Sequence, residues 1–205
     1  SSDVCSSDLA GISNISRIDA FKTEDGKKVP CDGQLWYRGY NVIDLIHGFE
    51  GKRFGFEEVA YLLLFGELPD AAKLGAFKSM LEECRQLPTN FTRDVIMKAP
   101  SKDIMNSLTR SVLTLASYDE TIADQELHTQ LEQCIKLISV FPMLAVYGYH
   151  AYNHYICDDS LYIHRPQEGL SAAENLLLML RPDKAYTELE ARVLHIALVL
   201  HMEHG

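Results

Sequence analysis

The sequence has a shortage of positive charge and no apolar run of the length needed to cross a membrane. Its 205 residues include 19 Lys and Arg against 29 Asp and Glu, a formal net charge of −10, and the basic residues form no cluster. The longest apolar runs fall well short of the roughly 20 residues that span a bilayer, and no basic stretch followed by an apolar one opens the chain. Nucleic acids and anionic membranes are bound by basic surfaces, so we expect neither as a partner.

Cysteine is scarce, and its spacing is not that of a disulfide framework. The five cysteines are widely separated, and none forms a Cys-x-x-Cys pair. An odd number in this arrangement favours a reducing compartment, in which each thiol is a small core side chain. We therefore expect a cytoplasmic protein.

Several motifs typical of catalysis or nucleotide binding are also missing. The sequence contains no Gly-x-Gly-x-x-Gly, no Walker motif, no Gly-x-Ser-x-Gly and no His-Glu-x-x-His. No stretch repeats at a period of about 20 to 50 residues, which argues against a helical solenoid. What remains is an ordinary globular composition, 47% hydrophobic and 23% charged, that can form a proper core.

The chain divides into three segments by pattern. Residues 1–9 repeat Ser-Ser-Asp without apolar periodicity, and we predict that they are not native sequence. Residues 10–40 contain short apolar runs around two Asp-Gly pairs, which predict turns at residues 25–26 and 32–33 and a β-hairpin around the first. Residues 41–205 show helical periodicity and form a predicted helical domain.

Capping residues, glycines and prolines place about eight helices in this domain, so the predicted class is all-α with a small N-terminal hairpin. The helices are expected at residues 41–47, 56–65, 70–87, 91–98, 101–117, 124–155, 171–180 and from 187 onward. Ser101 is the predicted cap of the fifth helix, and Pro142 should break or kink the sixth. The half after Pro142 is rich in tyrosine and histidine, which line either a pocket or a core.

The last helix contains the densest polar cluster of the chain. It begins with a capping box formed by Thr187 and Glu190. One face carries an apolar stripe of Leu189, Val193, Ile196, Ala197 and Leu200. Because the other faces are apolar too, we expect this helix to be buried nearly all round. Extending the stripe places His204 on a core face, with Glu203 pointing away from it.

Three roles fit His204 on this pattern. A buried imidazole can be a core residue bonded to a carbonyl, as most buried polar groups are. It can instead bind a ligand at the end of a rigid helix. It can also join His201, three residues earlier, in a metal site, but two ligands are too few for zinc and no third is indicated. We predict no metal.

Five stretches are informative in combination, and they follow one another along residues 26–205. They are GKKVPCDGQLWYRGYNVIDLIHG, FGFEEVAYLLLFGELPD, PMLAVYGYHAYNHY, LSAAENLLLMLRP and LHMEHG. In this order they resemble the citrate synthase family, in particular the bacterial citrate and 2-methylcitrate synthases. The resemblance extends from about Gly11 to Gly205, and it implies much of the large helical domain of a longer enzyme, truncated before the small domain.

The resemblance also implies a reaction. Members of the family join an acyl-CoA thioester to oxaloacetate without a cofactor, by proton abstraction, carbon–carbon bond formation and thioester hydrolysis. Two histidines and an aspartate carry this chemistry, and in the family's order all three lie beyond Gly205, so no catalytic residue is expected in this chain. The second histidine of the HMEHG motif binds oxaloacetate in the family, which implies substrate binding by His204 with His201 as a supporting neighbour.

The expected function is therefore condensation of acetyl-CoA with oxaloacetate to citrate and CoA in a homodimeric enzyme, with this chain alone inactive. The resemblance leaves open a 2-methylcitrate synthase that uses propionyl-CoA. A rival hypothesis of another class is a helical interaction module without chemistry, and a third is a metal-binding helical protein using His201 and His204.

Overall fold

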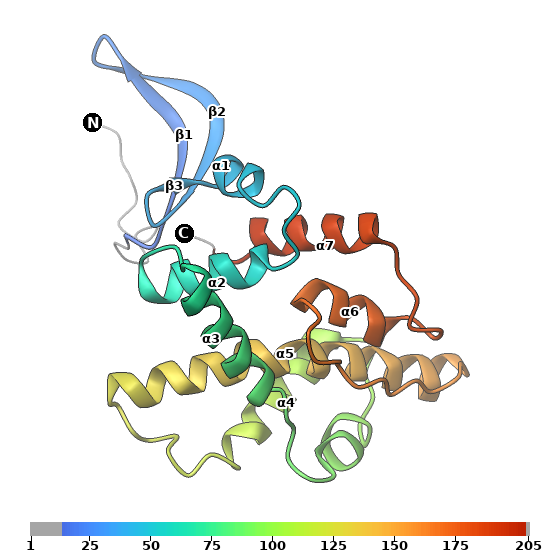
Figure 1. The fold of residues 1–205 in the computed structure, drawn as a ribbon. Helices are drawn as coiled ribbons and strands as arrows, with labels where there is room; N and C mark the ends of the chain where they lie inside the picture. Colours follow the sequence, from blue (N-terminus) through green and yellow to red (C-terminus); the bar gives the residue numbers. More distant parts are fainter. Residues whose placement is uncertain (1–13, 204–205) are drawn as a thin grey trace.

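The computed structural model describes residues 14–203, as a long β-hairpin joined to layers of helices (Figure 1). The predicted class, all-α with a small N-terminal β-hairpin, is confirmed. Residues 1–9, predicted not to be native, and His204 lie outside the described part of the chain. The proposed division into segments ending at residues 9 and 40 stays a prediction.

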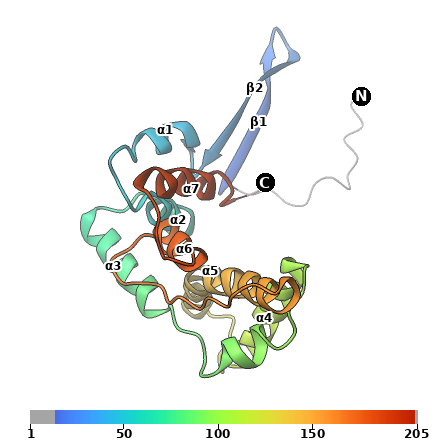
Figure 2. The same ribbon diagram turned by 90° about the vertical axis from the view of Figure 1, so that its right-hand side faces the viewer.

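The hairpin consists of strands β1 (Ser16–Glu24) and β2 (Lys27–Tyr37), which pair antiparallel. The turn predicted between them is confirmed: Asp25 and Gly26 have positive φ angles of 50° and 75°, as a two-residue hairpin turn requires. The hairpin extends away from the helices, and only its base lies against them (Figures 1 and 2).

The second predicted turn, at residues 32–33, is wrong. Those residues lie inside β2, where the pairing register shifts between Asp19 and Phe21 of the opposite strand. Such a shift inserts extra residues into one strand without reversing the chain. The chain instead reverses at Arg38 and Gly39, with φ angles of 48° and 86°, and enters the short strand β3 (Tyr40–Asn41).

The helical part follows in chain order. Its elements are α1 (Val42–His47), α2 (Gly55–Phe65), α3 (Ala71–Glu83), the short π-helical segment η2 (Thr92–Ile96), α4 (Ile104–Ala116), α5 (Leu127–Cys157), α6 (Ala172–Leu180) and α7 (Glu188–Leu200). All the predicted helical segments exist. The third predicted helix, α3, ends at Glu83 and not at residue 87, and Cys84 is its C-cap.

Most helix starts follow the predicted capping chemistry. Asn41, Ser171 and Thr187 each accept a backbone N–H of the first turn, and the last two form complete capping boxes. Ser101 was the wrong cap for α4, because Asp103 holds that place and accepts the N–H of Asn106 at 3.0 Å. The Ser101 hydroxyl accepts the N–H of Asp103 at 3.1 Å, one step before the helix.

Helix α5 passes through Pro142 without a break, so a break at this residue is wrong, while a kink stays a prediction. Proline has no N–H, so the Ile138 carbonyl one turn earlier loses its helical donor, and packing on both sides keeps the helix intact. By length and composition alone α5 could cross a membrane, with a mean hydropathy of 1.3 over its most apolar window, although 56% of that window is buried inside the fold. A core helix passes the same test, and α5 contacts α3, α4 and α6.

Three apolar clusters hold the layers together. The largest lies between α4, α5 and α6 and includes Leu108, Leu144 and Met179. A second joins α2 and α3 to α5, and a third joins the base of the hairpin to α1, α2 and α7 through Tyr37 and Val199. Each fully buried large side chain contributes on the order of 1.5–3 kcal/mol. Figure 2 shows the resulting order, in which α6 lies between α7 and α5.

Candidate functional site

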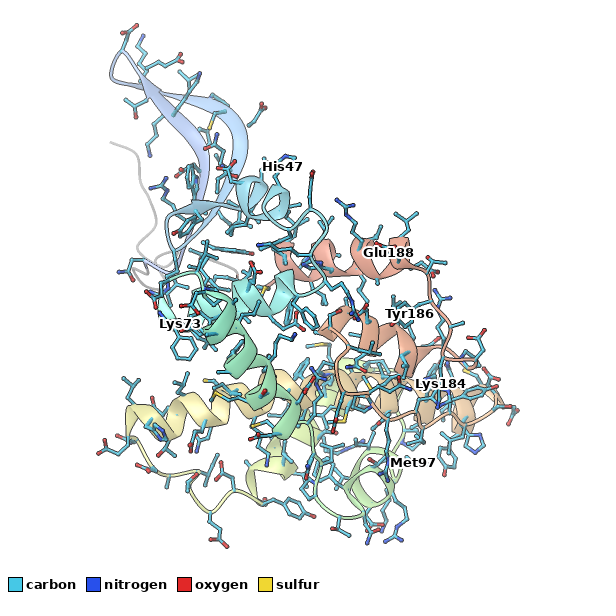
Figure 3. All side chains as sticks on the ribbon, in the orientation of Figure 1. His47, Lys73, Met97, Lys184, Tyr186 and Glu188 are labelled. Atoms are coloured by element: carbon cyan, nitrogen blue, oxygen red, sulfur yellow. The ribbon has the colours of Figure 1, made fainter. Side chains whose placement is uncertain are left out.

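Helix α7 precedes His201 and His204, the two residues that the sequence analysis assigned to the site. Hydrogen bonds to Glu190 hold the start of this helix. The Glu190 carboxylate accepts the Thr187 backbone N–H at 2.8 Å and an Arg181 Nη2–H at 2.7 Å. These hydrogen bonds, from the Thr187 backbone, from Arg181 and from the Thr187 side chain, lower the pKa of Glu190 to about 2. The loop through Lys184 and Tyr186 brings the chain up to Glu188 at the start of this helix (Figure 3).

The buried face of α7 is not the predicted one. Leu189, Val193 and Leu200, all members of the predicted stripe, are 70%, 60% and 42% exposed. The helix packs on α2 and α6 through Ala191, His195 and Val199, which recur every four residues on another side. The expectation of burial nearly all round is wrong for the described residues, since α2 and α6 cover only one side of a helix whose apolar residues surround it.

His201 ends α7 and is exposed. Its backbone N–H donates to the Leu198 carbonyl, and its Nδ1 lies 2.7 Å from the Ala197 carbonyl oxygen, one turn back. The imidazole therefore serves the helix end, where carbonyls lack intrahelical donors. His204, three residues further, is outside the described residues, so its assignment as a substrate ligand stays a prediction.

The base of the hairpin touches the end of α7 at two points. The Tyr37 hydroxyl donates to the Val199 carbonyl at 2.9 Å, and the Ser16 hydroxyl donates to Glu203 Oε1 at 3.2 Å. Ser16 and Tyr37 face each other across the two strands. The sequence contains no signal for these contacts, because the partners are 162 and 187 residues apart.

His195 is a buried histidine that the sequence reasoning missed. It lies one turn before Val199, and a Cβ on Gly55 would stand only 2.3 Å from its Nε2. The ring also lies against Phe49, with centroids 5.7 Å apart. Burial, with a smaller contribution from Arg192, lowers the pKa of His195, so the neutral form is favoured. Its four-residue spacing from Ala191 and Val199 was the signal that could have identified this face.

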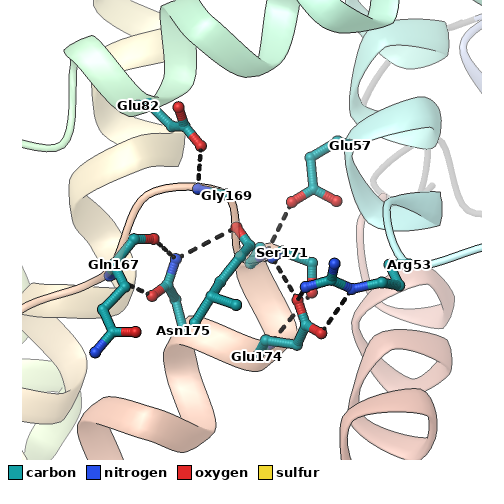
Figure 4. Close-up of polar contacts among 10 residues, drawn as sticks. Arg53, Glu57, Glu82, Gln167, Gly169, Ser171, Glu174 and Asn175 are labelled. Carbon is teal, nitrogen blue, oxygen red and sulfur yellow. Dashed lines mark hydrogen bonds and ion pairs between the residues drawn. The ribbon is translucent and has the colours of Figure 1, made fainter. Parts of the chain in front are cut away.

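A polar network anchors the start of α6, next to α7 (Figure 4). Arg53, from the loop before α2, forms a bidentate ion pair with Glu174. The Nε–Oε1 and Nη2–Oε2 distances are 2.9 and 2.8 Å. Burial raises the pKa of Glu174, but the hydrogen bonds from Arg53 and Ser171 outweigh it and leave the pKa lowered. The capping box and the ion pair thus share one carboxylate.

Glu57 is the buried acid of this region. Its Oε1 accepts the Ala172 N–H, the first of α6, at 2.7 Å. Its Oε2 has no hydrogen-bond partner among the described protein groups and borders a cavity of about 20 Å³ that Arg85 and Pro142 also line. Burial raises the pKa of Glu57, and the Ala172 N–H and the positive charge of Arg85 act against that rise.

The described residues hold no cluster of three or more His, Cys, Asp or Glu side chains that could bind a metal. In the aromatic half of α5, Tyr147 and His150 belong to the core, and their polar atoms contact the carbonyls of His164 and Met179 at 2.8 and 3.0 Å. Tyr149 and Tyr155 are exposed. Residues 14–203 form a scaffold that holds the end of α7 against the base of the hairpin.

Comparison with known proteins defines the class first. Over 96% of its length the chain superposes on citrate synthase from Pyrobaculum aerophilum, with a TM-score of 0.76 and 26% identity, and covers 46% of that chain. It also shares its fold, at a TM-score of 0.78 and 24% identity, with a Thermoplasma acidophilum citrate synthase solved with carboxymethyl coenzyme A and oxaloacetate. The fold is that of the citrate synthases.

The sequence comparisons agree with the fold. A family model described as the citrate synthase C-terminal domain matches residues 6–205. The chain is 31% identical over 170 residues to a 2-methylcitrate synthase of Shewanella oneidensis and 32% identical over 182 residues to a citrate synthase of Haloferax volcanii, covering 83% and 84% of this chain. The chain belongs to the citrate synthase family, which confirms the resemblance. It spans 42% and 44% of the length of these two relatives.

Proposed function

We propose that this chain is part of an enzyme that condenses acetyl-CoA with oxaloacetate to give citrate and CoA. The observation that carries the proposal is the match to the citrate synthase family along residues 6–205, which runs to the end of the His-Met-Glu-His-Gly segment after α7. The Thermoplasma acidophilum relative in fold was solved with oxaloacetate and a CoA derivative. We expect no cofactor and a cytoplasmic homodimer.

The chemistry defines what this chain contributes. A carbanion beside a thioester forms at neutral pH only when preorganised donors stabilise the enolate oxygen. We assign no residue of this chain to that task, since in the family the catalytic histidines and the aspartate come after the HMEHG segment. This chain contributes substrate binding. His204 donates a hydrogen bond to an anionic oxygen of oxaloacetate, and His201 caps the C-terminal end of α7, which precedes His204.

His204→Ala in the full-length protein tests this substrate-binding role. A hydrogen bond between charged partners contributes roughly 1.5–3 kcal/mol, so kcat/KM for oxaloacetate should fall about 10- to 100-fold, while the KM for acetyl-CoA changes much less. His128→Ala is the matched control, because that imidazole lies on the surface of α5 near only Glu132. A lowered melting temperature with unchanged oxaloacetate kinetics would instead make His204 a core residue.

The activity itself is assayed by release of CoA thiol in the full-length protein. We expect turnover with acetyl-CoA plus oxaloacetate and none from residues 1–205 alone, because residues that act as one constellation lose nearly all activity when separated. Faster turnover with propionyl-CoA would identify a 2-methylcitrate synthase, the activity named for the Shewanella oneidensis relative. No turnover with either thioester would favour a helical interaction module.

A further inference from the structure

The end of α7 needs support from outside the helix. The last carbonyls of a helix have no intrahelical donors, and this end leads directly into the segment that carries His204. The Val199 carbonyl receives the Tyr37 hydroxyl at 2.9 Å and the Met202 N–H at a longer 3.5 Å. Of these two donors to the Val199 carbonyl, Tyr37 is therefore the closer one.

Tyr37 is itself held rigidly. Its side chain is 0% exposed and packs in the cluster that contains Leu62 and Val199. It is the last residue of β2, paired with Ser16 on one side and Tyr40 on the other. The adjacent Arg38 donates to the Leu63 carbonyl through Nη2 at 2.8 Å and Nε at 3.2 Å, which ties the base of the hairpin to α2.

The strand partner of Tyr37 supplies a second contact. Ser16 donates to Glu203 Oε1. The cross-strand pair of Ser16 and Tyr37 therefore contacts α7 at Val199 and the following segment at Glu203. Burial raises the pKa of Tyr37, while backbone hydrogen bonds from Glu203 and Met202 lower it. The pair thus contacts the chain at Val199, before His201, and at Glu203, after it.

We propose that Tyr37 is a positioning residue for the substrate segment: with Ser16 it fixes the last turn of α7 and Glu203, the residue that precedes His204 in the sequence. This rests on the proposed function, in which His204 binds oxaloacetate. The Tyr37 side chain is fully buried among the described residues. It acts through the backbone, because a rotation of the last helical turn would displace the residues that follow it in the chain.

Tyr37→Phe in the full-length protein tests the proposal, and Tyr147→Phe is the matched control. Both hydroxyls are buried and donate to a carbonyl, at 2.9 and 2.8 Å, but the partner of Tyr147 is His164, away from α7. A neutral hydrogen bond contributes about 0.5–1.5 kcal/mol, so Tyr37→Phe should raise the KM for oxaloacetate about 3- to 10-fold with kcat and the acetyl-CoA KM within 2-fold. Tyr147→Phe should lower the melting temperature without moving any KM.

Hydrogen exchange separates this proposal from the proposed function. In the same proteins, the amides of Met202 and Glu203 should exchange about 3- to 10-fold faster in Tyr37→Phe and at the normal rate in Tyr147→Phe. Faster exchange in a protein without synthase activity would support the positioning and reject the function. Normal exchange, or an unchanged oxaloacetate KM in an active enzyme, would overturn the positioning role.

A second variant covers the case in which Tyr37→Phe does not fold. Ser16→Ala removes only the contact to Glu203 Oε1 and leaves the strand ladder intact. It should speed exchange at Glu203 and raise the oxaloacetate KM by a smaller factor, about 2-fold. If Ser16→Ala leaves both quantities at the wild-type value, the hairpin does not position the segment.

Discussion

Gly55, at the start of α2, lies directly against the side chains of His195 and Phe49. A Cβ at this position would lie 2.3 Å from His195 Nε2 and 2.7 Å from Phe49 Cγ, distances that packed atoms do not adopt. Neither neighbour can move easily, because both rings are buried. At this position glycine provides space and not backbone freedom.

Gly55→Ala should therefore destabilise the protein by about 1–3 kcal/mol, the usual result of overpacking a core. Gly75→Ala is the control, because Gly75 lies in α3 with nothing within 4 Å of an added Cβ. There alanine should stabilise by about 0.5–1 kcal/mol through its higher helix propensity. Urea unfolding measures the change in the free energy of unfolding for each variant. Equal changes in the two variants would contradict the close packing of α2 on α7.

Glu57 predicts a dependence of stability on pH. Its pKa in the folded protein is raised above the ordinary value of 4.5, so the folded state binds this proton more tightly than the unfolded state. The associated stability is complete below about pH 4.5 and is lost as the pH rises through the folded pKa. Ionisation of the buried Glu57 carboxyl therefore opposes folding.

Glu57→Gln removes this titration and keeps an oxygen that can accept the Ala172 N–H. Relative to the wild type, the variant should gain stability as the pH rises from about 4.5 to 8, and the difference should be smallest at acid pH. Glu120→Gln, at an exposed position, is the control and should show no such trend. Unfolding midpoints at several pH values measure the difference, and a flat difference would place Glu57 in contact with water.

At the scale of the element, an ion pair holds the start of α6 in addition to apolar packing. Arg53 reaches from the loop before α2 to Glu174, the same carboxylate that caps the helix. The arginine side chain is 54% exposed, so solvent screens the pair and its contribution is modest. The pair matters mainly because it links α6 to α2 and thereby places α7.

Arg53→Gln should destabilise the protein by about 1 kcal/mol, the upper part of the range for partly exposed pairs. Glu174, whose pKa is lowered, stabilises the fold above its unfolded pKa and loses that effect as the pH falls, so the variant should differ most from the wild type at neutral pH. Arg93→Gln is the matched control, since Arg93 pairs with Asp94 on the surface, and it should change nothing measurable. Thermal unfolding in low and high salt compares them.

At the scale of the whole molecule, the described chain leaves much apolar surface uncovered. The outer side of α7 exposes Leu189 and Val193, and α4 and α5 expose Met105, Leu113 and Leu127. Apolar surface of this extent is covered by other protein in folded assemblies. Within residues 14–203, α7 packs on α2 and α6 through its opposite side, which carries Ala191, His195 and Val199.

Residues 1–205 alone should therefore associate in solution into dimers or larger species. Light scattering measures the mass, and Val193→Glu, which places a charge on the exposed side of α7, should reduce it. Lys98→Glu, at an exposed position away from α7, is the control and should leave the mass unchanged. A monodisperse wild-type monomer would contradict the expectation.

Features that depend on neighbours in the sequence were predictable. The capping boxes at Ser171 and Thr187, the cap at Asn41 and the hairpin turn at residues 25–26 all join groups within three residues, so composition and spacing determine them. The order of the five family stretches was equally visible, and the family match confirms the interpretation drawn from it. For these features the sequence by itself was sufficient.

Tertiary structure alone decided which side of α7 is buried, why Gly55 must be glycine and what holds the end of the helix. A helix that is apolar on all sides has no preferred buried face until its partners are known. The predicted stripe through Leu189 and Val193 was one of several equally apolar faces, and it is not the buried one. The contact of Tyr37 with Val199 crosses 162 positions, and no local pattern encodes it. Long-range packing determines such contacts, because the hydrophobic effect has no direction of its own.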